Sequence, residues 1–229
     1  MSDLRIALIS EGPTDSVIIE AALKAMLAPR TFTLTRLQPE ATRPQMGSGW
    51  CGVFKWCRAF AARAPASLEE DPTLPNFDLF VVHLDADVAD KTYADGGPEL
   101  ELAAKDMPAL PCSQPCPPPT DSADPLRVRM LAWLGMASLG SKTVLCVPSK
   151  AIEAWLAAGV LDPSHALLTG LECVATLEAR LAALPLATRI KKMPRAYREH
   201  APEVTENWAR VCATCTQAAR FGHDVAAAL

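Results

Sequence analysis

The chain has 229 residues, of which 50% are hydrophobic and 21% are charged, a composition typical of folded globular proteins and not of disordered ones. Its net charge of −4 excludes a uniformly basic surface that would coat nucleic acid. The first residues carry an acid at Asp3 and no basic stretch, which is not the pattern of a signal or transit peptide. No segment reaches the roughly 20 apolar residues that span a bilayer, so we expect a cytoplasmic protein that makes no membrane contact.

Short apolar runs predict strands, and the segments between them have the spacing of helices. The predicted strands are 4–9, 31–37, 78–84 and 143–147. The predicted helices are 16–27, a stretch of about 53–61 that follows a glycine-rich turn, 126–139, and a helix around 152–156 that Ser149 can cap. Apolar strands that alternate with helices are typical of a parallel sheet covered on both faces. We therefore predict an α/β fold with a small, mainly parallel sheet flanked by helices.

The organisation along the chain predicts one α/β domain with a helical continuation. Residues 1–160 hold all the predicted strands. They are interrupted at about 93–125 by a segment rich in proline, acids and cysteine, which we expect to be an irregular insertion. Residues 161–229 show helical patterns joined by a basic loop. We expect this helical C-terminal region to pack on the same core.

Three carboxylates follow two of the predicted strands. Glu11 stands just after the first strand, in Glu-Gly-Pro-Thr-Asp, and Asp85 and Asp87 come directly after the third. Ligands gather at the carboxyl ends of parallel strands, so we expect these side chains to meet at one edge of the sheet. On an extended backbone, Asp85 and Asp87 point the same way. Closely spaced carboxylates repel one another unless a cation or a proton holds them, and Mg²⁺ or Mn²⁺ favours such oxygen ligands.

These motifs resemble the Toprim domain, which is shared by topoisomerases, bacterial primases and the overcoming-lysogenization-defect nucleases. The resemblance lies in Glu11-Gly12-Pro13-Thr14-Asp15 and in Leu84-Asp85-Ala86-Asp87. A further stretch, Ser149-Lys150-Ala151-Ile152-Glu153-Ala154-Trp155-Leu156, is similar to the I-E-x-W-L helix of small Toprim-like proteins of the DUF4276 group. Val88-Ala89-Asp90 stands where the usual pattern often has a glycine, so this loop departs from the family.

The resemblance implies a metal-dependent nuclease with a Toprim/Rossmann-like sheet. Asp85 and Asp87 would ligate Mg²⁺ (or Mn²⁺), and Glu11 would be a ligand or a general base. The metal would polarise a phosphodiester and lower the pKa of a bound water. Glu153 is the candidate for a second-metal ligand. Its alternative is an ordinary acidic residue in the first turn of a helix, where the helix dipole favours it.

Basic residues supply candidate contacts to phosphate. Lys150 could neutralise charge that develops on a phosphate, and Lys191, Lys192 and Arg195 lie in a stretch, 180–198, that contains cations and no acid. A solvated helix face and loop explain this stretch equally well. The resemblance implies nucleic acid as the partner, DNA before RNA, and a role in bacterial anti-phage defence beside a partner protein such as an ATPase.

The cysteines and one histidine have competing interpretations. Cys112 with Cys116, and Cys212 with Cys215, have spacings that a zinc site accepts, but free cysteine commonly acts as a small core residue. His83 shares its parity with Asp85 and could join a metal shell. A histidine inside a buried strand is more often a hydrogen-bonded core residue.

Two other functional hypotheses stay open on the sequence. The first is a different metal-dependent phosphoryl or glycosyl transfer enzyme, because nucleotide-sugar transferases and haloacid-dehalogenase phosphatases also use D-x-D. The phosphatase pattern requires a threonine where this chain has Ala89, and the transferase gives the Glu11 motif no role. The second is a non-catalytic nucleic-acid or nucleotide-binding component of a larger defence complex.

Overall fold

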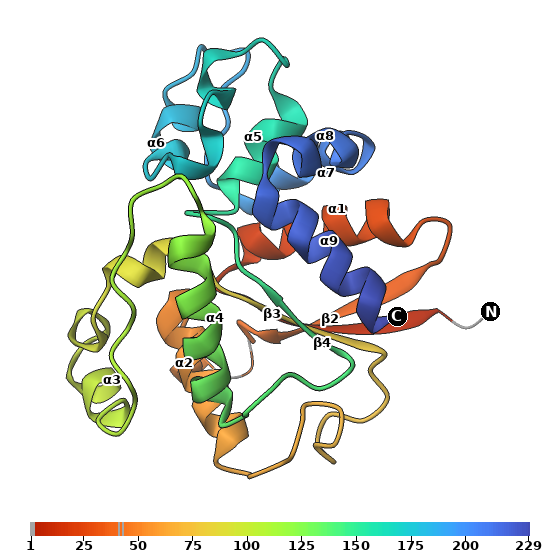
Figure 1. The fold of residues 1–229 in the computed structure, drawn as a ribbon. Helices are drawn as coiled ribbons and strands as arrows, with labels where there is room; N and C mark the ends of the chain where they lie inside the picture. Colours follow the sequence, from red (N-terminus) through yellow and green to blue (C-terminus); the bar gives the residue numbers. More distant parts are fainter. Residues whose placement is uncertain (1–2, 41, 43) are drawn as a thin grey trace.

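A four-stranded parallel sheet forms the centre of the protein in a computed structural model that describes residues 3–40, 42 and 44–229 (Figure 1). The strands are β1 (Leu4–Ile9), β2 (Phe32–Gln38), β3 (Leu79–His83) and β4 (Thr143–Cys146), in the spatial order β2-β1-β3-β4. Each neighbouring pair is parallel. The predicted α/β class with a parallel sheet is therefore confirmed.

Two hydrophobic cores cover the two faces of this sheet. Side chains alternate along β1, so that Ile6 and Leu8 pack into one core, and Ala7 and Ile9 pack into the other. Because β1 is central and buried on both faces, its sequence is almost continuously apolar.

The helices are divided between the two cores. The first core contains residues of α1 (Pro13–Leu27), α5 (Glu153–Val160), α6 (Leu177–Ala182), α7 (Pro194–Glu206), α8 (Trp208–Thr214) and α9 (Thr216–Ala228). The second contains residues of α2 (Gly49–Ala61), α3 (Pro98–Ala103) and α4 (Thr120–Leu134). Short 3-10 helices connect these elements: η1 (Pro44–Met46), η2 (Ala86–Asp90), η3 (Tyr93–Gly96), η4 (Ala166–Leu168) and η5 (Leu171–Cys173).

The C-terminal helices pack on the same core as the sheet. Trp155 of α5 lies with its ring centroid 5.5 Å from Trp208 of α8 and 5.7 Å from Phe221 of α9. All three side chains belong to the core that also holds Ile6 and Leu8. Hydrophobic contacts therefore run between the segments 1–160 and 161–229.

Three local expectations were wrong. The segment 93–125 is not irregular throughout, because it contains η3, α3 and the start of α4. Helix α4 begins at Thr120 and ends at Leu134, not at 126 and 139. Pro125 lies close enough to the helix start for its ring to face only carbonyls of the first turn, and Gly135 stops the helix at a positive φ of 69°. Ser149 does not cap α5, since its hydroxyl donates to the carbonyl of Glu172.

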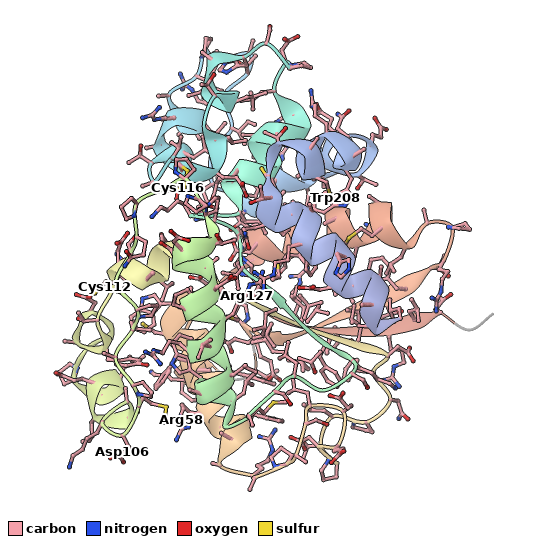
Figure 2. The ribbon with its side chains drawn as sticks, viewed as in Figure 1. Arg58, Asp106, Cys112, Cys116, Arg127 and Trp208 are labelled. Atoms are coloured by element: carbon pink, nitrogen blue, oxygen red, sulfur yellow. A yellow bond between two sulfur atoms is a disulfide. The ribbon has the colours of Figure 1, made fainter. Side chains whose placement is uncertain are left out.

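The cysteines do not form the four-residue zinc site that their spacing allows. Cys116 is joined to Cys173 by a disulfide, and Cys112 is exposed and lies apart from this bridge (Figure 2). Cys215 is buried in the hydrophobic core, and Cys212 is packed beside that core. Cys212 and Cys215 therefore act as small core residues, as the alternative to a zinc site expected. No helix in the described part of the chain is both long and apolar enough to cross a membrane.

The close approach of α5 and α7 gives a test of this packing. A Cβ added at Gly159 would lie 2.9 Å from the backbone Cα of Val204, so Gly159→Ala should destabilise the protein by about 1–3 kcal/mol. Gly222 of α9 is the matched control, because its nearest neighbour would be the flexible Met26 Sδ at 3.3 Å. Gly222→Ala should leave the free energy of unfolding equal or higher, because alanine has a higher helix propensity than glycine by up to about 1 kcal/mol. Urea unfolding measures both changes, and equal effects of the two variants would contradict the packing.

Candidate active site

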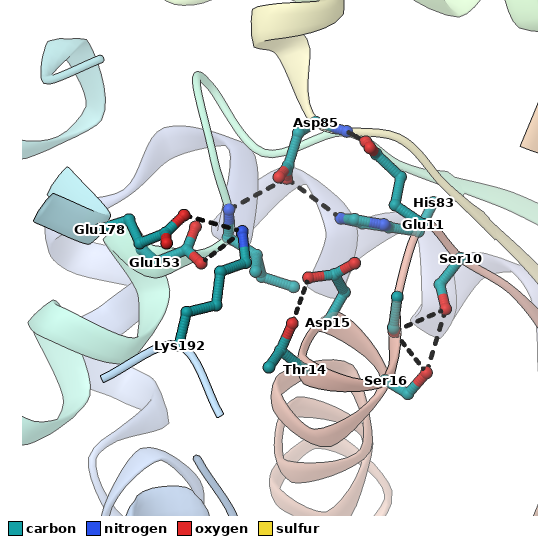
Figure 3. Close-up of polar contacts among 12 residues, drawn as sticks. Ser10, Glu11, Thr14, Asp15, Ser16, His83, Asp85, Glu153, Glu178 and Lys192 are labelled. Atoms are coloured by element: carbon teal, nitrogen blue, oxygen red, sulfur yellow. Dashed lines mark hydrogen bonds and ion pairs between the residues drawn. The ribbon is translucent and has the colours of Figure 1, made fainter. Parts of the chain in front are cut away.

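Glu11 and Asp85 meet where β1 and β3 end side by side (Figure 3). The carboxylate Oε1 of Glu11 accepts a hydrogen bond of 2.7 Å from the backbone N–H of Asp85. Parallel pairing of the two strands sets this contact, because it brings their carboxyl ends to the same edge. The expectation that these residues converge agrees with the geometry.

The segment that follows a third strand, β4, also holds Asp85 in place. Its Oδ1 accepts a hydrogen bond of 3.0 Å from the backbone N–H of Ile152, in the segment between β4 and α5. The Nε2 atom of His83 lies 3.2 Å from the same oxygen, but the angles are not those of a hydrogen bond. Both ring nitrogens of His83 are buried without a hydrogen-bond partner among the described residues. His83 therefore lies in the site and is not a hydrogen-bonded core histidine, which was the alternative interpretation.

Asp15 is a site residue that the sequence interpretation missed. The predicted helix began at residue 16, which left Asp15 just before it, but α1 begins at Pro13 and Asp15 lies within its first turn. The side chain is buried, and its Oδ1 accepts a hydrogen bond of 3.2 Å from the Thr14 hydroxyl. The only available signal was its place as the last residue of the Glu-Gly-Pro-Thr-Asp motif.

Glu153 is fully buried and is held by two residues from the C-terminal region. Its Oε1 accepts a hydrogen bond of 2.8 Å from the hydroxyl of Tyr197 and lies 3.1 Å from Nζ of Lys192. Lys192 also pairs with Glu178 at 3.2 Å. The other oxygen of Glu153, Oε2, is buried and has no hydrogen-bond partner among the described residues. Glu153 is thus part of the acidic cluster, with one oxygen already engaged.

Asp87 lies at the margin of the cluster. The sequence interpretation assumed an extended backbone from Asp85 to Asp87. This assumption was wrong, because the 3-10 helix η2 begins at Ala86. Its backbone N–H donates to the carbonyl of Lys150 at 3.1 Å, and its side chain is half-buried. Its charge still acts on Asp85, whose pKa it helps to raise.

Burial and mutual repulsion perturb every carboxylate discussed so far whose shift is resolved. Burial raises the pKa of Asp85 well above its ordinary value, and neighbouring carboxylates, Asp15 foremost, raise it further. Burial and then the charge of Asp85 do the same for the pKa of Glu11. Burial also raises the pKa values of Asp15 and Asp87. The common cause is a concentration of negative charge in a region that water reaches poorly.

A single lysine compensates part of this charge. Burial disfavours the charged form of Lys192, but the carboxylate of Glu153 outweighs this effect and raises the pKa of the lysine above its ordinary value. Burial, followed by the charge of Glu153, raises the pKa of the Tyr197 hydroxyl, which therefore remains a proton donor. Lys192 is exposed along part of its side chain, but its Nζ pairs with Glu153 and Glu178 of the acidic region.

The other predicted phosphate-binding residues lie outside the cluster. Nζ of Lys150 donates a hydrogen bond of 2.9 Å to the Ser113 hydroxyl. Arg195 is exposed and pairs with Glu199 at 3.0 Å, and Lys191 is exposed beside Lys192. The structure thus brings together Glu11, Asp85, Glu153 and Lys192 and leaves Lys150, Lys191 and Arg195 outside this group. The phosphate-binding roles of these basic residues stay predictions.

The oxygen ligands that the cluster offers are of the kind that a hard divalent cation prefers. Its ligands would be carboxylate oxygens, which suit Mg²⁺ and Mn²⁺, and Glu153 Oε2 is a buried oxygen with an unmet demand for positive charge. Within residues 3–40, 42 and 44–229, no three His, Cys, Asp or Glu side chains are gathered closely enough to hold a metal ion. Binding would therefore require side chains such as Glu11 and Asp85 to turn toward a common point.

Comparisons of the chain with family models, with curated proteins and with solved structures find no match. The geometry and charge of the cluster, together with the motif resemblance, are therefore the features that bear on function.

The buried charge predicts how stability depends on pH in the absence of metal. The folded-state pKa of Asp85 lies above its unfolded value of about 3.9, so its contribution to stability is present below that value and is lost as pH rises through the folded-state pKa. Asp85→Asn should therefore raise the melting temperature at neutral pH in EDTA, and the difference should shrink toward pH of about 4. The asparagine Oδ1 can still accept from Ile152.

Asp71 is the matched control, because its pKa is lowered whereas that of Asp85 is raised. It is buried, but hydrogen bonds from Thr73 and Arg63 outweigh burial and lower its pKa. Asp71→Asn should lower the melting temperature at neutral pH, and this loss should fade at acidic pH. A melting temperature for Asp85→Asn that falls as far as that of Asp71→Asn at neutral pH would contradict the repulsion argument.

Proposed function

We propose that this protein is a metal-dependent phosphodiester hydrolase of the Toprim type that acts on nucleic acid. The observation that carries the proposal is the buried cluster of Glu11, Asp15, Asp85 and Glu153 at the carboxyl ends of the strands, with Lys192 as its paired cation. Four carboxylates against one lysine leave an excess of negative charge, which a divalent cation would compensate. The motif resemblance supports the same chemistry.

Mg²⁺ (or Mn²⁺) would be held by Glu11, Asp85 and Asp87, with Glu153 as a candidate for a second position, and would polarise the phosphodiester and activate water. The chain's own residues position this site. The N–H of Asp85 orients Glu11, and the N–H of Ile152 orients Asp85. Burial and then the charge of Asp85 raise the pKa of Glu11 above its ordinary value, which makes this carboxylate a stronger proton acceptor and suits a general base.

One observation favours a non-catalytic binding component as the second candidate. Lys192 already reaches Glu153 and Glu178, so part of the charge is neutralised without any metal. A domain that only binds nucleic acid or a nucleotide within a larger complex could use such a cluster as a structural element. Another phosphoryl or glycosyl transfer reaction remains the alternative if metal binds and nucleic acid is not cleaved.

The cellular setting is proposed from the resemblance. We place the protein in the cytoplasm, with DNA before RNA as its substrate and a partner protein such as an ATPase in an anti-phage defence system. The disulfide between Cys116 and Cys173 is the feature that opposes this placement, because disulfides persist mainly in oxidising compartments.

Cleavage assays test the proposed activity. Purified protein should cut plasmid, linear or single-stranded DNA, or RNA, in Mg²⁺ or Mn²⁺ and not in EDTA. Asp85→Asn and Glu11→Gln keep the backbone hydrogen bonds of these side chains but remove their charge, so each should lower the rate at least about 100-fold. Asp71→Asn, a buried acid outside the cluster, should retain activity at a temperature where it is folded. Equal activity of all three variants would exclude this site as the catalytic one.

Metal binding gives a separate prediction that does not depend on cleavage. A cation that binds only the folded state stabilises it, by about 2.7 kcal/mol when the free metal is about 100 times its dissociation constant. Mg²⁺ or Mn²⁺ should therefore raise the melting temperature of the wild-type protein, and Glu11→Gln/Asp85→Asn should abolish the shift. An unchanged melting temperature in the wild type would favour the binding component, whereas a shift without cleavage would favour another metal-dependent reaction.

A further inference from the structure

A groove of about 510 Å³ lies outside the acidic cluster, between α1 and α7 and beside the edge strand β2. Its apolar floor includes Val17 and Ala21 of α1, and its walls include Arg36 of β2 and Arg198 of α7. Figure 1 shows α1 near the β2 edge of the sheet. Neither the motifs nor the acidic cluster accounts for this groove.

No residue of the acidic cluster lines the groove, but α1 and α7, which form the groove, both begin beside the cluster. Asp15 lies in the first turn of α1, and Tyr197, in the first turn of α7, donates to Glu153. Farther along, the hydroxyl of Thr205 donates to the carbonyl of Ala21 at 3.0 Å, so the two helices leave the cluster in the same direction. Arg198 follows Tyr197 directly. A chain molecule that occupies the cluster can therefore continue into the groove.

The groove carries cations that lack partners. Arg36 and Arg198 are exposed, and neither guanidinium has a hydrogen bond or an ion pair among the described residues. Lys24 is paired with Glu20 at 2.7 Å, and Glu206 is the other acid in the lining. The groove thus contains three cations and two carboxylates, in a protein whose net charge is −4.

We propose that Arg36 and Arg198 bind a backbone phosphate of a nucleic-acid strand whose neighbouring segment enters the acidic cluster. The guanidinium group presents planar donors that match phosphate oxygens, and two of them on opposite walls can hold one phosphate between them. This inference rests on the proposed function for the identity of the strand. It extends that function by giving the substrate a second binding site, outside the acidic cluster where the phosphodiester would react.

The proposed function favours nucleic acid over an acidic peptide as the occupant of the groove. A peptide carboxylate could also pair with the arginines, but the cluster next to the groove would repel a polyanion unless the cation that compensates the cluster is bound. Phosphate and carboxylate oxygens are both hard ligands for that cation, so the choice of nucleic acid follows from the proposed hydrolysis of a phosphodiester. The test therefore includes polyglutamate as a competitor.

The experiment measures equilibrium binding of a fluorescent single-stranded DNA oligonucleotide as a function of salt, with Ca²⁺ present to compensate the cluster and with cleavage monitored by gel. Each phosphate contact contributes about 0.7 to the slope of log K against log salt for single strands. Arg36→Ala/Arg198→Ala should weaken binding about tenfold or more and reduce this slope. Because both side chains are exposed, the variant should fold, which circular dichroism checks.

Lys105→Ala/Lys142→Ala is the matched control, because it removes two exposed lysines that do not line the groove. It should leave the slope unchanged. Glu206→Gln should act in the opposite direction and tighten binding, since it removes an acid from the groove. The proposal is overturned if the control weakens binding as much as the arginine variant, if polyglutamate competes as well as DNA, or if the wild-type protein does not bind the oligonucleotide.

Failure of this inference can be told apart from failure of the proposed function. If the arginine variant changes binding but Mg²⁺ and Mn²⁺ support no cleavage of any nucleic acid, the groove stands and the hydrolase proposal fails. If metal-dependent cleavage occurs with wild-type affinity and salt slope in the arginine variant, the hydrolase stands and the groove proposal fails.

Discussion

The hydrogen bond from the Asp85 N–H to the Glu11 carboxylate is the contact on which the candidate site depends. It joins the carboxyl ends of β1 and β3 at 2.7 Å and places the partly buried Glu11 beside the buried Asp85. Parallel pairing of these strands makes the contact possible, because an antiparallel neighbour would put the two strand ends at opposite edges. The apolar character of both strands thus serves the site as well as the core. It fixes where the polar residues that follow the strands must lie.

This placement has an energetic cost that other residues reduce only in part. Desolvation and repulsion favour the neutral forms of Glu11 and Asp85, while Glu153 is held by an ion pair with Lys192 and a hydrogen bond from Tyr197. The cluster is therefore asymmetric. One side is compensated by a lysine and a phenol, and the other is left to protons or to a cation. Such uncompensated burial is common at functional sites and rare in parts of a protein that serve stability alone.

The sequence allowed prediction of the sheet, of its parallel character and of the meeting of Glu11 with Asp85, because these follow from strand periodicity and from the rule on strand ends. Asp15 was missed because a helix start offers an acid an ordinary role. The position of Lys192 could not be predicted, since it depends on how a loop some 40 residues after Glu153 folds back on the core. The backbone at Asp87 was wrongly expected to be extended, because a 3-10 helix has no pattern of side chains distinct enough to identify in advance.

The contacts of Lys192 and Tyr197 make the C-terminal helices part of the site. Both residues lie in the segment 161–229, whereas the carboxylate that they hold lies in 1–160. The same segments share the core around Trp155, Trp208 and Phe221. Removal of the C-terminal helices would therefore expose that core and would also leave Glu153 as a buried charge without its partners, a loss that destabilises proteins strongly. The site and the fold consequently share tertiary contacts, and the helical region is needed to hold Glu153 in the acidic cluster.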